Sequence, residues 1–232
     1  MKIKERKFKQ PEVGEIPEGR IEIEGEKFSL LYDYDREKLK RLSDEGKIEW
    51  FKERMRFIFI NPVRLLWDRS SELYKQVNTD EMPAVEHCGF NIAIFCTVLS
   101  GVESYGAFLK GVTKHDRENK SIFAAYVQKY MSEWYTNVKI DGQQKHITDL
   151  LWDKCRNAIA HGFRIMEIGI DFIEEKGVEK NWGWIKKIFH INCFKFFFDF
   201  VESASSFYRD IDADPAMKSK FVKTFNAFYP VN

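Results

Sequence analysis

Three polar side chains end an otherwise apolar stretch of the chain, residues 150–162. They are Arg156, Asn157 and His161, and Gly162 follows them. Histidine gains and loses a proton near neutral pH, and the planar guanidinium of arginine is a permanent cation that holds phosphate oxygens. Together these residue types suit proton transfer beside a phosphate group.

The spacing of these residues limits how they can act together. On an ideal helix Asp153, Asn157 and His161 form one polar row, because each lies four residues after the last. Arg156 and His161 are five residues apart, which places them about 140° apart around the axis. They cannot converge on one atom from a regular helix. Either the backbone departs from helical geometry at 160–162, or a second subunit completes the site.

The run from Arg156 to Gly162, Arg-Asn-Ala-Ile-Ala-His-Gly, resembles the motif of the HEPN superfamily. That motif is an arginine and a histidine separated by four to six residues, at the end of one helix of a compact bundle. The resemblance is firm over residues 84–162. It implies metal-independent cleavage of RNA, in which His161 transfers protons and Arg156 stabilises the phosphate. DNA, which lacks the 2′-hydroxyl, should not be cut.

The resemblance also implies roles for two further side chains and for a second subunit. Asn157 would orient the imidazole or bind backbone phosphate. Glu103 matches the acidic residue often found on the preceding core helix of the family, and would position Arg156 or share in acid–base work. Members of the family typically form homodimers whose two motifs line one cleft. We therefore expect a homodimeric endoribonuclease of the toxin or phage-defence type, with no metal and no cofactor.

Phe163 stands where some members of the family carry a tyrosine, two places after the histidine. This difference argues against a nucleotidyltransferase antitoxin that modifies such a tyrosine. An antitoxin or regulatory protein of another kind stays open as a partner, beside RNA as the substrate. The alternative function is a non-catalytic HEPN module that binds nucleotide or RNA, or a purely structural dimerisation protein.

Each candidate residue also has a purely structural interpretation. Arg156 can anchor the helix through a salt bridge to Asp153 or Glu103. His161 can be a helix-terminal histidine favoured by the macrodipole. Asn157 can make a hydrogen bond across a dimer interface, and Glu103 can be a bundle carboxylate satisfied by a tyrosine or lysine.

A second group of candidates forms a small basic and aromatic patch on a predicted β-hairpin. Its members are Lys180, Trp182, Trp184, Lys186 and Lys187. This patch is the best candidate for contact with a nucleic-acid backbone, and the alternative is an ordinary solvated strand face. The phenylalanines between residues 194 and 200 follow helical spacing, which favours core and interface packing over RNA stacking.

Composition narrows the class of protein. The chain has 232 residues with 37 Lys+Arg against 36 Asp+Glu, so a net charge of +1 excludes a broad electrostatic binder of nucleic acid. Aromatic residues make up 16%, which is enough for a bundle core together with a dimer interface. Signatures of nucleotide hydrolases, zinc proteases and α/β-hydrolases are missing from the sequence.

The cysteines and the apolar segments predict a cytoplasmic protein. The four cysteines form no C-x-x-C pair and are expected to be reduced, and the histidines lack metal-ligand spacing. The N-terminus has no apolar signal region, and the longest apolar run, 92–102, is expected to be too short to cross a bilayer.

Periodicity predicts a mainly α fold, an HEPN-like helical bundle. An N-terminal arm, 1–33, is expected to hold a β-hairpin at Glu24-Gly25-Glu26, and residues 34–232 are expected to form a single domain. The Asn61-Pro62 pair is expected to split the first helical region, and Asp141-Gly142 is expected to close the fourth helix. The predicted elements are a broken helix pair in 35–78, helices through 84–110, 122–134 and 147–161, a β-hairpin in about 163–191, and C-terminal helices in 193–209 and 215–228.

Overall fold

The computed structural model describes residues 19–30, 36–66, 84–113, 119–156, 168–171, 174–175, 178–185 and 188–229. In this part of the chain the protein is mainly helical, with small β-sheets, as the sequence predicts.

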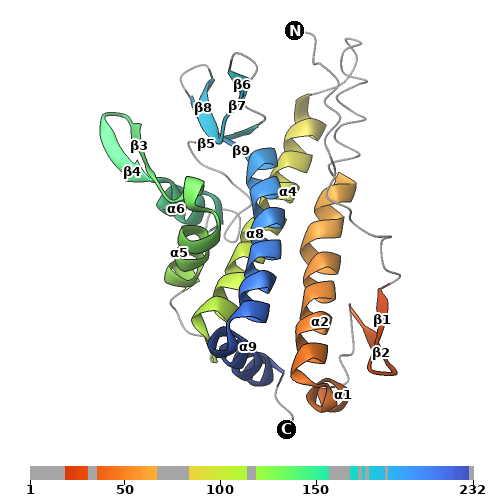
Figure 1. The fold of residues 1–232 in the computed structure, drawn as a ribbon. Helices are drawn as coiled ribbons and strands as arrows, with labels where there is room; N and C mark the ends of the chain where they lie inside the picture. Colours follow the sequence, from red (N-terminus) through yellow and green to blue (C-terminus); the bar gives the residue numbers. More distant parts are fainter. Residues whose placement is uncertain are drawn as a thin grey trace.

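Long helices lie side by side and form the body of the molecule (Figure 1). The apolar helix α4 packs against α5 on one side and against α8 and α9 on the other. The helices are α1 (Arg36–Arg41), α2 (Asp44–Met55), α4 (Ala84–Lys110), α5 (Asn119–Tyr130), α6 (Ile147–Leu150), α8 (Cys193–Ala213) and α9 (Pro215–Phe228).

The starts of the two C-terminal helices are confirmed. The Asn192 side chain accepts hydrogen bonds from the backbone N–H groups of Phe194 and Lys195, and so caps α8. Asp214 caps α9 in the same way, and Pro215 occupies the first helical position, where no N–H is needed.

The predicted break at Asn61-Pro62 is wrong. Helix α2 passes into a π-helical turn, η1 (Arg56–Ile60), and residues 61–66 continue as helix. Asn61 has helical dihedral angles (φ −62°, ψ −44°), and its backbone N–H donates to the Arg56 carbonyl. The widened turn directly before Pro62 accommodates a residue that lacks a backbone N–H, so the proline does not end the helix.

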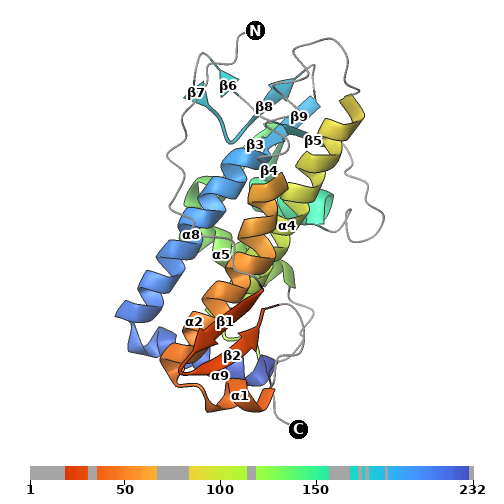
Figure 2. The same cartoon turned by 90° about the vertical axis from the view of Figure 1, so that its right-hand side faces the viewer.

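The N-terminal hairpin is confirmed. Strands β1 (Arg20–Ile23) and β2 (Glu26–Ser29) pair antiparallel around Glu24 and Gly25, which have φ of 52° and 78°. The Glu24 carboxylate accepts hydrogen bonds from the backbone N–H and the hydroxyl of Ser43, the residue that caps α2. Figure 2 shows this hairpin lying across α2. Two of its side chains join the main core, Ile23 and Phe28.

A second hairpin replaces the predicted end of the fourth helix. Helix α5 ends at Tyr130, a single 3₁₀ turn η2 (Ser132–Trp134) follows, and β3 (Asn137–Ile140) then pairs antiparallel with β4 (Gln143–His146). Asp141 and Gly142 form the turn between the strands, with φ of 50° and 78°. Positive φ at both positions matches the twist of a hairpin, so this dipeptide is a hairpin turn and not a helix end.

The predicted hairpin in 163–191 is partly wrong. Strands β8 (Trp182–Ile185) and β9 (Ile188–Asn192) do form an antiparallel pair, but β5 (Ile168–Asp171) lies parallel to β9. Between β5 and β8 lies a small antiparallel hairpin of β6 (Glu174–Glu175) and β7 (Val178–Glu179). Strand β9 is therefore parallel to β5 and antiparallel to β8. Residues 163–167 lie outside the described part. The sheet has the order β5, β9, β8.

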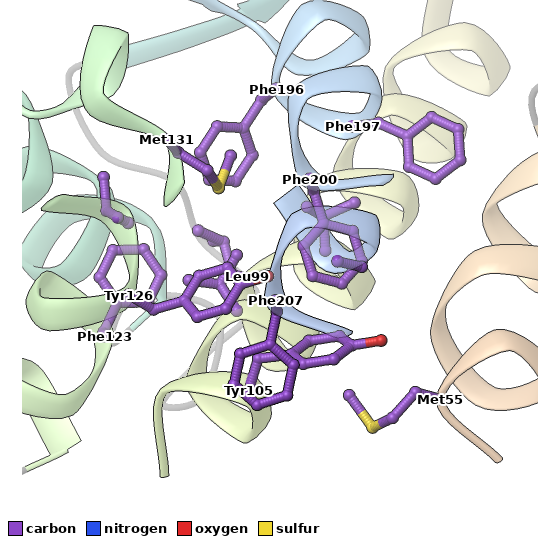
Figure 3. Close-up of a cluster of buried hydrophobic side chains, with 14 of the residues drawn as sticks. Met55, Leu99, Tyr105, Phe123, Tyr126, Met131, Phe196, Phe197, Phe200 and Phe207 are labelled. Carbon is purple, nitrogen blue, oxygen red and sulfur yellow. The ribbon is translucent and has the colours of Figure 1, made fainter. Parts of the chain in front are cut away.

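An aromatic core joins the helices (Figure 3). Tyr105 of α4 contacts the rings of Tyr126, Phe200 and Phe207 from α5 and α8, with centroids 5.2–5.7 Å apart. A Cβ atom at Gly101 would lie 2.5 Å from the Phe200 ring, so glycine allows α8 to approach α4 closely. The phenylalanine run of α8 therefore supplies core, as its spacing predicts.

Helix α4 is more apolar than the 92–102 run suggests. The stretch Asn91–Lys110 has a mean hydropathy of 1.6 and, by length and composition only, could cross a membrane. This corrects the expectation that the longest apolar segment is too short to do so. Half of this stretch is buried inside the bundle. That position is typical of the central helix of a soluble protein.

Candidate functional site

The candidate site is built on an ion pair between two helices. Arg156 ends a π-helical turn, η3 (Leu151–Arg156), and its Nε donates a hydrogen bond to Glu103 Oε2 of α4 at 2.9 Å. The side chains of Arg156 and Glu103 are 29% and 20% exposed. The structure thus brings together two of the four residues that the sequence analysis singled out as catalytic.

Asp153, the other partner considered for Arg156, points elsewhere. Lys120 of α5 bridges Asp149 and Asp153, with its Nζ 2.9 and 2.8 Å from their carboxylate oxygens. The hydrogen bonds that Lys120 donates to Asp153 and Asp149 raise the pKa of its ammonium group. These three side chains are about half exposed, so this cluster lies on the solvent side of η3.

The backbone of η3 departs from a regular α-helix. The π-helical geometry covers 151–156, whereas residues 160–162, where one of the two sequence-based alternatives predicts a departure that re-aims His161, lie outside the described residues. A π turn holds more residues than an α turn. Two residues that are five apart within a π turn therefore lie closer to the same side of the helix than they would in an α-helix. Such turns are frequent at functional sites, and this one ends on Arg156.

An aromatic ring and a thiol lie near the Arg156 guanidinium. Its central carbon lies 6.0 Å from the centroid of the Trp152 ring, which is itself buried. Burial raises the pKa of the Cys96 thiol, and the charge of Arg156 opposes this rise in part. Cys155 is fully buried, and burial raises its pKa well above the usual range. Because water is partly excluded here, the attraction between Glu103 and Arg156 is stronger than it would be at the surface.

The ion pair uses one side of the guanidinium. Only Nε of Arg156 binds Glu103, and the two terminal amino groups make no hydrogen bond to the residues that the structure describes. Those groups form the edge that grips two oxygens of a phosphate or carboxylate. The pair is therefore arranged so that Glu103 orients Arg156 while one edge stays available for an anion.

Asn157 and His161 lie outside the described residues, so their geometry relative to Arg156 stays a prediction. The same holds for the cleft shared by two subunits. In the part of the chain that the structure describes, no three histidine, cysteine or carboxylate side chains are grouped to hold a metal ion. Three cysteines in that part carry free thiols, Cys96, Cys155 and Cys193.

The basic aromatic patch proves to be divided. Trp182 is partly buried and packs edge-to-face on the buried Trp134, with ring centroids 6.0 Å apart, so it contributes to packing. Trp184 is 52% exposed, and Lys180 is exposed as well. The other two members, Lys186 and Lys187, lie outside the described residues.

Trp152 is a contact of the site that the sequence analysis did not single out. It stands four residues before Arg156, a spacing at which helical side chains meet. Because Trp152 lies in an apolar helix, its sequence position indicates a core residue. The Phe123 ring does pack against the Trp152 ring, with centroids 5.5 Å apart.

Comparison with known proteins adds no relative: neither family models, nor curated proteins, nor solved structures give a match to this chain. The site is therefore interpreted from its own residues and from the resemblance of its motif.

Proposed function

We propose that the protein is a metal-independent endoribonuclease of the HEPN type that acts as a homodimer. One observation carries the proposal: Glu103 holds Arg156 by its Nε at the end of η3, and no other described residue binds the phosphate-binding edge of the guanidinium. A salt bridge whose only role was to join two helices would be stronger if a carboxylate also accepted hydrogen bonds from the terminal amino groups of the guanidinium. Here the geometry suits an arginine that is oriented by one partner in order to bind another.

The reaction needs little besides this arginine and a histidine. The 2′-hydroxyl of one nucleotide attacks the adjacent phosphorus, the bond from phosphorus to the 5′-oxygen breaks, and the products are a 2′,3′-cyclic phosphate and a free 5′-hydroxyl. The attacking hydroxyl loses a proton and the leaving oxygen gains one. His161 carries out proton transfer, because histidine is the side chain type whose ordinary pKa lies near neutrality. Arg156 stabilises the charge that builds on the non-bridging oxygens.

The role of Glu103 in this proposal is positioning. A free arginine side chain samples many rotamers, and one fixed by a hydrogen bond from Nε is held ready for the phosphate. Asn157 follows Arg156 directly, and we propose that it orients the imidazole or binds backbone phosphate. The biological setting that we propose is a cytoplasmic toxin or phage-defence protein, restrained by an antitoxin or regulatory partner.

The proposal is tested by incubating mixed RNA with the purified protein in EDTA. We expect the wild type to cut RNA and to leave a DNA oligonucleotide of the same sequence intact, because DNA has no 2′-hydroxyl. We expect Arg156→Ala and His161→Ala each to lower the cleavage rate by about 100-fold or more. Arg209→Ala is the matched control, since Arg209 is an exposed arginine of α8 that donates a hydrogen bond to Ser206.

Two outcomes would contradict the proposal. One is a wild type that leaves RNA intact, and the other is cleavage by both variants at the wild-type rate. Binding of RNA without cleavage would favour the non-catalytic module instead.

A further inference from the structure

Large exposed apolar side chains gather on two neighbouring elements at one end of the bundle. In the described part of the chain such residues are few, and three of the four lie on the β8–β9 hairpin or at the start of the β3–β4 hairpin. Contiguous exposed apolar groups on a soluble protein mark interaction surfaces. The three are Tyr135, Trp184 and Ile188, and the fourth is Leu65.

The two hairpins lie side by side (Figures 1 and 2). Trp134 of η2 contacts Trp182 of β8, with ring centroids 6.0 Å apart, and the Asn181 side chain donates a hydrogen bond to Glu133 at 3.5 Å. Tyr135 directly follows Trp134, and Trp184 lies two residues after Trp182 on the same face of the strand. The two exposed rings are therefore within reach of one short strand of nucleic acid.

Each exposed ring is held in place along one edge. The Trp184 ring packs edge-to-face on the buried Phe189, with centroids 5.6 Å apart. The Tyr135 ring packs on His146 at 4.3 Å, and the Nδ1 of His146 is itself fixed by a hydrogen bond from the Thr148 N–H. Rings that are anchored and still exposed lose little conformational entropy when a flat ligand stacks on them.

The charges around these rings favour a polyanion. Lys139 lies on the β3–β4 hairpin and Lys180 lies just before β8, and neither forms an ion pair with a residue that the structure describes. Acidic residues are also near: Glu133 faces Lys195 at 3.9 Å, Asp141 lies at the tip of the β3–β4 hairpin, and Glu179 directly precedes Lys180 in the chain. A purely apolar partner would leave the lysines without counter-charges, whereas phosphates would pair with them.

We propose that Tyr135 and Trp184 are stacking platforms for the bases of single-stranded RNA, and that Lys139 and Lys180 contact its phosphates. Aromatic platforms beside lysines bind single strands because every unpaired base offers a flat face, whereas the bases of a duplex are already stacked. The choice of RNA rests on the proposed function. The inference replaces Trp182, which is packed, with Tyr135, which the sequence analysis did not consider.

The test uses a fluorescently labelled 12-nucleotide 2′-O-methyl RNA, which cannot be cut because its 2′-oxygen is blocked. Binding is followed by fluorescence anisotropy. We expect Trp184→Ala and Tyr135→Ala each to raise Kd about tenfold, and Trp184→Phe to retain most of the affinity. Leu65→Ala removes an equally exposed apolar side chain, 53% against 52%, outside this surface, and should leave Kd unchanged.

Several results would overturn the inference: no binding by the wild type, wild-type Kd in both alanine variants, an equal loss in Leu65→Ala, or equal binding of the same strand in a duplex. A change of oligomeric state in Trp184→Ala without a change in Kd would assign the surface to a second copy of the chain. Near-ultraviolet circular dichroism checks that each variant is folded. A wild type that binds this strand but cuts no natural RNA would refute the proposed function alone.

Discussion

The turn η3 carries two charged clusters that differ in their surroundings. On its outer side Asp153 shares Lys120 with Asp149, and these side chains are 44–55% exposed. On its inner side Arg156 meets Glu103, and both are less than one third exposed. Three residues along one turn therefore separate a solvated cluster from a sheltered pair.

The difference shows why an ion pair has to be judged by its surroundings. Water and salt screen the outer cluster, and such surface pairs contribute about 0–1 kcal/mol. The inner pair lies beside Trp152 and Cys96, where charges interact more strongly and where a lost partner is not replaced by water. The outer cluster attaches η3 to α5, and the inner pair fixes the direction of a guanidinium.

The largest effect is expected when the inner pair loses its acid. Glu103→Gln keeps the shape of the side chain and leaves the Arg156 charge half-buried without a counter-charge, so the free energy of unfolding should fall by about 2 kcal/mol. Urea denaturation measures this change. RNA cleavage should fall at least tenfold, because the guanidinium is no longer oriented. The control is Glu202→Gln on the exposed face of α8, and equal effects of the two substitutions would contradict the comparison.

A smaller effect is expected in the coupling within each cluster. Double-mutant cycles of alanine substitutions should give about 1–2 kcal/mol between Glu103 and Arg156, and less than about 0.5 kcal/mol between Lys120 and Asp153. In 1 M NaCl the second coupling should vanish and the first should persist. RNA cleavage by Asp153→Asn should stay at the wild-type rate. Equal couplings in the two clusters would remove the distinction between them.

The smallest effect concerns pH. The pKa of Lys120 is raised above its ordinary value of 10.5 in the folded protein, because its ammonium group donates hydrogen bonds to Asp153 and Asp149. The stabilisation is therefore fully present below pH 10.5 and is lost as the pH rises through the folded pKa. Stability measured from pH 9 to 12 should fall slightly more for the wild type than for Lys120→Met. A parallel pH dependence of both proteins would contradict the assignment.

Features held by local hydrogen bonds were predictable from the sequence. Asn192 and Asp214 are short polar residues placed just before helical periodicity, and each caps its helix through its own side chain. The turn at Glu24-Gly25 needs positive φ, which glycine adopts at no cost. The same reasoning applies to the turn at Asp141-Gly142. That turn was assigned to a helix end because the residues before it were interpreted as helical.

Features that depend on neighbours distant in sequence were not predictable. Alternating residues mark a strand but do not say which strand lies next to it, so the parallel pairing of β5 with β9 was missed. Pro62 predicts a helix break by its chemistry, and only the π turn before it allows the helix to continue. Trp182 and Trp184 look alike in the sequence, and packing on Trp134 separates the partly buried Trp182 ring from the exposed Trp184 ring.

The motif residues show which features can be predicted from the sequence and which depend on packing. Residue type and period are local properties, so the sequence indicates that Arg156 lies near the end of an apolar helix and that Glu103 lies on the apolar helix 84–110. That Glu103, and not the nearer Asp153, binds Arg156 depends on how the helices pack. The reason is physical: Asp153 faces water and Lys120, whereas the packing of η3 against α4 brings Arg156 to Glu103, 53 residues away in the chain.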